Sequence, residues 1–136
     1  MDLLFPAPLR ARMIAAARVA FPNECCGLME GERAGETIRV LALHPTANLA
    51  GDPAAGFEID PAAHIALRCT LRGTGRSVVG CYHSHPNGRP TPSERDRASG
   101  CEEGFVWVIA AVAGGDVTLA AFEGPSFRAL PLVPDI

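Results

Sequence analysis

The residues GCYHSHPNGRPTPSERD, positions 80–96, carry the pattern that decides how this chain folds. They begin within a mostly apolar run that ends at His85, where Pro86 stops strand pairing because it has no N–H to donate. Side chains alternate along a strand, so His83 and His85 project from the same face. The segment therefore predicts a strand over 77–85 that ends with two imidazoles side by side.

A third candidate ligand follows on the next predicted element. After a proline-rich loop, Ser93 is expected to open a short helix that runs to about Gly100, and Asp96 lies in its first turn. Two histidines and one carboxylate, with a fourth position open for water, are typical of a catalytic zinc site. The spacing therefore predicts Zn²⁺ bound by His83, His85 and Asp96.

Each half of this pattern also has a simpler explanation. A lone His-x-His in a strand commonly consists of histidines that pack in the core or lie on the surface without binding a metal. Ser93-x-x-Asp96 matches a capping box, which by itself only caps the start of a helix. The two interpretations need not exclude each other, because Ser93 can cap the helix through its position while its hydroxyl points at the site. The whole combination favours metal binding.

Hydrophobic periodicity predicts the other elements. We expect a helix over 9–20, strands over 25–30 and 37–43, a loop over 44–56, a helix from Asp60-Pro61 to Gly73, and strands over 105–112, 117–122 and 127–133. In the second helix Ala62, Ile65, Ala66 and Cys69 are expected to face the core. The order of elements predicts an α+β fold, a mixed β-sheet flanked by helices, in one compact domain over 1–136.

Composition excludes several classes of function. Apolar residues make up 48% of the 136 residues and charged residues 20%, as in ordinary single-domain globular proteins. The net charge of −3 gives no basic surface for nucleic acid. No apolar run approaches the roughly 20 residues that span a bilayer. Arg10, Arg12 and Arg18 interrupt the N-terminal apolar residues, which argues against a signal peptide and for a cytoplasmic protein.

Cysteines and acidic residues outside the motif are expected to be structural. Five cysteines, with Cys25 and Cys26 adjacent, do not resemble a disulfide framework, so we expect small buried thiols in a reducing compartment. Cys81 shares the face of the two histidines and could be a fourth ligand, although a buried thiol is favoured. Glu30 and Glu32 are expected to be solvated.

The motif resembles that of a known family. The run His83-Ser84-His85-Pro86, six further residues and Ser93-x-x-Asp96, with Glu24 upstream in Asn23-Glu24-Cys25-Cys26-Gly27-Leu28, is similar to the JAMM (MPN-plus) metalloprotease motif over roughly residues 9–122. The resemblance implies a cytidine-deaminase-like α/β fold. It implies zinc on His83, His85 and Asp96, with Glu24 orienting and deprotonating the attacking water. Ser93 would help to stabilise the oxyanion.

The resemblance also implies a substrate class. JAMM enzymes hydrolyse peptide or isopeptide bonds, typically beside the C-terminus of ubiquitin-like proteins. Sheet-like sequence resumes at Phe105, so the chain looks like a minimal prokaryotic type that acts on small ubiquitin-like or sulfur-carrier proteins ending in Gly-Gly. Two alternatives stay open: a non-catalytic MPN-type scaffold, and a JAMM peptidase acting on cell-wall or phage-tail peptides. The sequence also leaves open whether the chain works as a homodimer.

Overall fold

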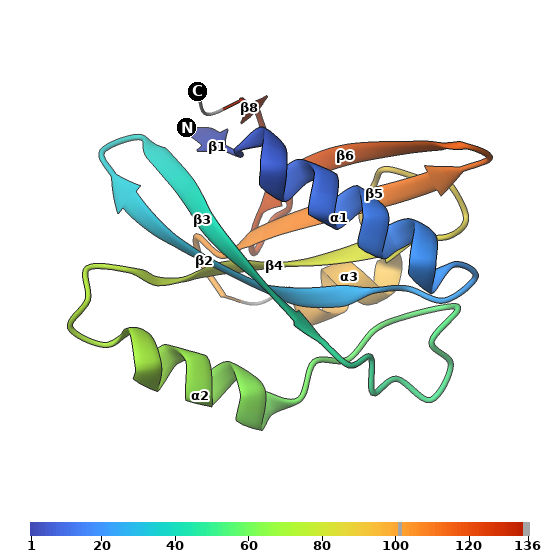
Figure 1. Ribbon diagram of the computed structural model, residues 1–136, viewed down its shortest axis with the longest axis horizontal. Helices are drawn as coiled ribbons and strands as arrows, with labels where there is room; N and C mark the ends of the chain where they lie inside the picture. The colour runs from blue at the N-terminus through green and yellow to red at the C-terminus, as the bar shows by residue number, and fades with distance from the viewer. Residues whose placement is uncertain (101, 135–136) are drawn as a thin grey trace.

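The computed structural model describes residues 1–100 and 102–134, in which one eight-stranded sheet is flanked by helices (Figure 1). The helices are α1 (Ala7–Ala20), α2 (Pro61–Leu71) and α3 (Glu94–Ser99). The strands are β1 (Asp2–Leu4), β2 (Cys26–Ala34), β3 (Thr37–Thr46), β4 (Ser77–His85), β5 (Val106–Ala113), β6 (Asp116–Glu123), β7 (Arg128–Leu130) and β8 (Leu132–Val133). The predicted fold class, a mixed sheet flanked by helices, is confirmed.

The strand order is β7-β6-β5-β4-β2-β3-β1-β8, which places β4 and β2 in the middle of the sheet. β4 runs parallel to β5 and antiparallel to β2, so the sheet is mixed. β7 and β8 lie at opposite ends of this order although only Pro131 separates them. Because two residue steps span at most about 7 Å, the sheet must curl until its two edges approach each other. The single strand predicted over 127–133 is therefore wrong.

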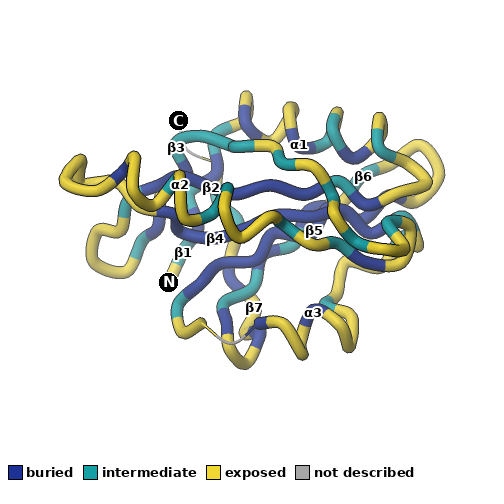
Figure 2. Tube along the Cα trace, turned by 90° about the horizontal axis from the view of Figure 1, so that it is seen from below, coloured by how far each residue is buried: buried dark blue, intermediate teal, exposed yellow. Residues whose placement is uncertain are grey.

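The two faces of the curled sheet carry separate hydrophobic clusters. The central strands β2, β4 and β5 are buried over most of their length (Figure 2). Leu9, Met13 and Ala17 of α1 pack on one face, against a cluster that includes Tyr82 of β4. The opposite face holds a smaller cluster that includes Cys81 of β4. Alternation along β4 therefore directs its last two histidines to the face of Cys81, away from α1.

Helix α2 turns a different side to the sheet from the one predicted. Its bounds fit the Asp60-Pro61 signal, and the Asp60 carboxylate accepts a hydrogen bond from the N–H of Ala62. Leu71 is buried and Leu67 packs against the smaller cluster, whereas Ile65 is 62% exposed. Ala62, Ala66 and Cys69 are exposed as well. The helical period was right but the buried stripe is displaced, because α2 turns Leu67 and Leu71 to the sheet and leaves Ile65 on the outside.

Two further expectations about single residues are wrong. Glu30 is buried in β2, where its carboxylate pairs with Arg76 and His44 at 2.9 Å each. The strand continues to Ala34, four residues beyond its predicted end at Glu30, so Glu30 lies within the sheet and not at its edge in a turn. Cys69 is exposed, while Cys26 and Cys81 are buried and Cys25 is half-buried; these four are free thiols. Cys101 lies outside the described residues.

No helix in the described part of the chain is long and apolar enough to cross a membrane. The longest, α1, has 14 residues.

The close pairing of β4 with β5 leads to a test of the fold. A Cβ added at Gly80 would collide with the backbone carbonyl of Val106, which cannot move without breaking the ladder. We expect Gly80→Ala to lower the free energy of unfolding by about 3 kcal/mol or more in urea denaturation. Gly115→Ala is the matched control, because nothing lies within 4 Å of its added Cβ. Equal midpoints for the two variants would contradict this packing.

Candidate metal centre

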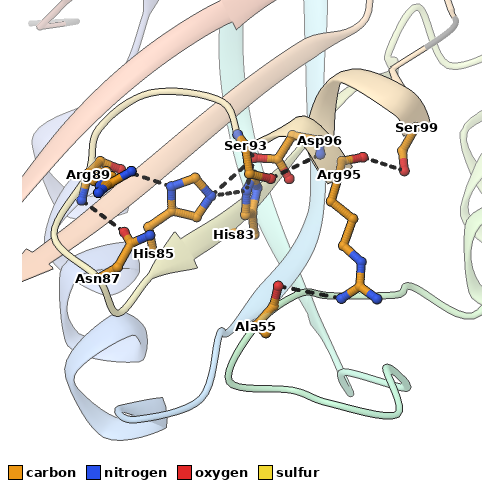
Figure 3. A network of polar contacts seen from close by, with 9 residues as sticks. All are labelled: Ala55, His83, His85, Asn87, Arg89, Ser93, Arg95, Asp96 and Ser99. Atoms are coloured by element: carbon orange, nitrogen blue, oxygen red, sulfur yellow. Dashed lines mark hydrogen bonds and ion pairs between the residues drawn. The ribbon is translucent and has the colours of Figure 1, made fainter.

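The three residues predicted as metal ligands come together at the end of β4 (Figure 3). His83 Nε2 lies 2.9 Å from His85 Nε2, and Asp96 Oδ2 lies 3.1 Å from each of them. All three side chains are buried. Strand alternation brings the imidazoles together, and the first turn of α3 delivers the carboxylate.

The donor set suits a small cation. Burial lowers the pKa of His83, which favours its neutral, metal-binding form. Burial alone would raise the pKa of Asp96, but hydrogen bonds with His83 and His85 hold it far below its ordinary range. Donor atoms about 2.0–2.1 Å from one tetrahedral zinc lie about 3.3 Å apart, close to the spacing here. One proton cannot be shared by His83 Nε2, His85 Nε2 and Asp96 Oδ2 at once, whereas a metal cation can bind all three.

Each imidazole is held by neighbours outside the triad. His85 Nδ1 donates to the carbonyl of Arg89 at 2.8 Å, so the Nε2 lone pair faces the other ligands. The His83 ring stacks on Phe57, with centroids 4.2 Å apart and 19° between the planes. Trp107 meets the same ring in a T-shaped arrangement, with centroids 5.9 Å apart and 88° between the planes. These contacts fix both rings before a metal binds.

Asp96 takes part in the capping box and in the triad at once. Ser93 Oγ accepts from the N–H of Asp96 at 3.0 Å, and Asp96 Oδ2 accepts from the N–H of Ser93 at 2.9 Å. The same Oδ2 faces both imidazoles. The two explanations of Ser93-x-x-Asp96 are thus compatible in one geometry, and the Ser93 hydroxyl keeps its proton free to donate.

Glu24 lies opposite the histidine pair. One carboxylate oxygen of Glu24 and one ring nitrogen each of His83 and His85 lie within 4.8 Å of one another. Glu24 is only 7% exposed, and its Oε1 has no hydrogen-bond partner. Burial raises its pKa to about 7, with the charge of His85 opposing the shift and that of Asp96 adding to it. A buried, unpaired carboxylate beside a triad of donors is suited to proton transfer.

The backbone at Glu24 is fastened to β4 by Ser84, the residue between the two histidines. The N–H of Cys25 donates to Ser84 Oγ at 2.8 Å, and the N–H of Ser84 donates to the carbonyl of Cys25 at 3.0 Å. The ladder then continues with Cys26 opposite His83. These bonds set Glu24 against the histidines, a role of Ser84 that the motif alone did not reveal.

Asn48 is a second residue that the sequence analysis missed. It organises residues 47–60, which we call the Asn48 loop. Its Nδ2 donates to the carbonyls of Glu24 and Gly56, at 3.1 and 3.0 Å, and its Oδ1 accepts from the N–H groups of Ala50 and Glu58. The loop also accepts the N–H of Glu24, through the carbonyl of Pro53 at 2.8 Å. The loop thus holds the Glu24 backbone on both sides.

Burial raises the pKa of Cys81 far above its ordinary range, which opposes the thiolate that a metal would need. Cys81 therefore belongs with the core, as favoured from the sequence.

Comparison with known proteins places this site in a family. Residues 6–123 match the family model of prokaryotic homologs of the JAB domain. The desampylase of Haloferax volcanii is 35% identical over 80% of this chain and 76% of its own length. The tail tip assembly protein K of Escherichia phage N15 is 30% identical over 77% of this chain, which spans 39% of that protein. A probable TtuB-protein conjugate cleaving protease of Thermus thermophilus is 37% identical over 55% of this chain and 47% of its own length.

The fold has a matching solved structure. A structure described as a JAMM metalloprotease-like zinc site in the proteasome and signalosome superposes with a TM-score of 0.59. It covers 98% of this chain and 99% of the other at 18% identity, so it supports the fold alone. The family model and the desampylase alignment carry the assignment beyond the fold. The chain belongs to the prokaryotic JAB family of JAMM-type hydrolases.

Proposed function

We propose that this protein is a zinc-dependent isopeptidase or peptidase that cleaves at the Gly-Gly C-terminus of a small ubiquitin-like or sulfur-carrier protein. His83, His85 and Asp96 would hold the zinc, Glu24 would act as general base, and Ser93 would stabilise the oxyanion. The observation that carries the proposal is the buried Glu24 carboxylate, whose Oε1 has no hydrogen-bond partner and which has an oxygen within 4.8 Å of a ring nitrogen of each imidazole.

Zinc bound there would lower the pKa of its water to about 7 and polarise the scissile carbonyl. Glu24 takes the proton of the attacking water and returns it to the leaving amine nitrogen. The Ser93 hydroxyl, whose oxygen already accepts from the N–H of Asp96, donates to the oxygen of the former carbonyl. The Asn48 loop and Ser84 keep Glu24 in place while the proton moves.

The names of the relatives support the substrate class. One relative is a desampylase and another is named for cleaving TtuB–protein conjugates, so cleavage of protein conjugates recurs among them. A Gly-Gly tail fits a buried centre, because it reaches the zinc position without bringing side chains along. The experiment is an assay with Gly-Gly-tailed small proteins of the source organism, linked to lysine-bearing partners, with and without a chelator. Cleavage that the chelator does not affect would refute the proposal.

One second candidate has specific support. The similarity to a phage tail tip assembly protein favours the alternative of a JAMM peptidase for phage-tail or cell-wall peptides. Cell-wall and tail peptides in the same assay separate the two substrates. The full donor set and the buried Glu24 argue against the alternative of a non-catalytic scaffold. The cytoplasmic location stays a prediction.

Metal binding is tested without substrate. We expect the purified protein to bind one equivalent of zinc, and His83→Ala to lose most of that affinity because a ligand is removed. His64→Ala is the control, since His64 lies on α2 and bonds Arg68. Metal analysis after dialysis against graded zinc buffers measures both. Equal zinc retention in the two variants would remove His83 from the site.

The role of Glu24 is tested by Glu24→Gln. We expect conjugate cleavage to fall at least about 100-fold, because the amide cannot accept the proton, while zinc content stays at one equivalent. Single-turnover kinetics and metal analysis check the two parts. Activity near the wild-type level would exclude Glu24 as the base.

The same variant gives a pH-dependent change in stability. In the metal-free protein the pKa of Glu24 is raised from 4.5 to about 7, so ionisation opposes folding increasingly as the pH rises between these values. We expect metal-free Glu24→Gln to be more stable than wild type by about 2 kcal/mol at pH 8 and to match it near pH 4.5. Urea denaturation at both pH values measures this. A difference independent of pH would contradict the burial of an ionised Glu24.

A further inference from the structure

The Asn48 loop also contacts α3 through Arg95 (Figure 3). Arg95 lies between Ser93 and Asp96, and its Nη1 donates to the carbonyl of Ala55 at 3.4 Å. The side chain thus spans from the helix that carries Asp96 to the loop that holds Glu24. No part of the catalytic mechanism proposed above uses Arg95.

Gly56 makes room for this contact. A Cβ added at Gly56 would collide with Arg95 Nη1 and lie 3.1 Å from Cδ and 3.2 Å from Cζ of the same side chain. The guanidinium therefore lies directly on the Gly56 backbone. Gly51, in the same loop, has nothing within 4 Å of an added Cβ, so of the two glycines of the loop only Gly56 lies under Arg95.

These contacts join the Asn48 loop, Glu24 and α3 into one network beside the candidate metal centre. Asn48 Nδ2 bonds the carbonyls of both Glu24 and Gly56, so the segment under Arg95 is tied directly to the backbone of the proposed base. Phe57, the next residue, stacks on His83. Arg95 completes the network, because it joins Gly56 to the helix that carries Asp96. Its charge also acts on the Glu24 carboxylate.

We propose that Arg95 is a positioning residue that fastens the Asn48 loop to α3 and so fixes Glu24 opposite His83, His85 and Asp96. The catalytic consequence rests on the proposed function, whereas the fastening does not. Arg97, the next arginine on α3, serves as a contrast, because its guanidinium lies over the ring of Phe127 and not over the loop. Arg95 itself is exposed, and its hydrogen bond with Ala55 is 3.4 Å long.

Hydrogen exchange tests the fastening without substrate. The amides of Leu49, Ala50 and Glu58 report loop closure, because each donates a hydrogen bond within the loop. We expect Arg95→Ala to raise their exchange rates about tenfold, and Gly56→Ala to do the same by displacing the guanidinium with its charge intact. Arg97→Ala and Gly51→Ala are the controls and should leave the rates unchanged. Unchanged loop exchange in Arg95→Ala would overturn the proposal.

Kinetics test the positioning of Glu24. We expect Arg95→Ala and Gly56→Ala each to lower kcat for conjugate cleavage about tenfold with one equivalent of zinc retained, since a displaced base transfers protons poorly. The double variant should be no slower than either single variant, because both remove the same contact. A merely local effect on stability would give additive losses.

The outcomes separate the two proposals. Faster loop exchange with an unchanged kcat would overturn the positioning of Glu24, and so would additive losses in the double variant. If wild-type protein cleaves no conjugate or peptide, the proposed function fails, and the exchange rates alone then decide for or against the fastening by Arg95.

Discussion

Two reciprocal hydrogen bonds between Ser84 and Cys25 join the end of β4 to the start of β2. Since side chains alternate along β4, His83 and His85 face one way while Ser84 faces the other and is free to hold the neighbouring strand. One short segment thus supplies both the ligands and the bond that brings Glu24 to them. The Asn48 loop, the capping box of α3 and the stacking of Phe57 all build on this junction.

The parts of the site that the sequence predicted are those fixed by local geometry. β4 has the predicted bounds, 77–85, because an apolar run ended by Pro86 leaves little freedom. Asp96 could be placed beside the imidazoles because a capping signal fixes where α3 begins. Glu24 could be assigned only through resemblance. The position of Glu24 depends on two hydrogen bonds between residues far apart in the sequence. Ser84 bonds Cys25 across 59 residues, and Asn48 bonds Glu24 across 24 residues. The periodicity of a sequence carries no information about such pairs.

The errors share a physical origin in tertiary packing. In α2 the period of apolar residues was right, but Leu67 and Leu71 contact the sheet instead of the smaller residues near Ile65. Glu30 was expected in water, yet β2 extends to Ala34 and Glu30 is buried within it, where its carboxylate pairs with His44 of β3 and with Arg76. The strand expected over 127–133 divides at Pro131 because a curled sheet offers each half a different edge. Each outcome was decided by a distant neighbour.

The double role of the Asp96 carboxylate has a thermodynamic consequence. One oxygen, Oδ2, caps a helix of six residues and also faces both imidazoles. So short a helix has little stability of its own. A cation bound to this oxygen therefore also stabilises the helix, which carries the neighbouring Arg95. By linkage, whatever orders the helix must tighten cation binding by the same factor. Metal occupancy and the order of the surrounding chain form one coupled equilibrium.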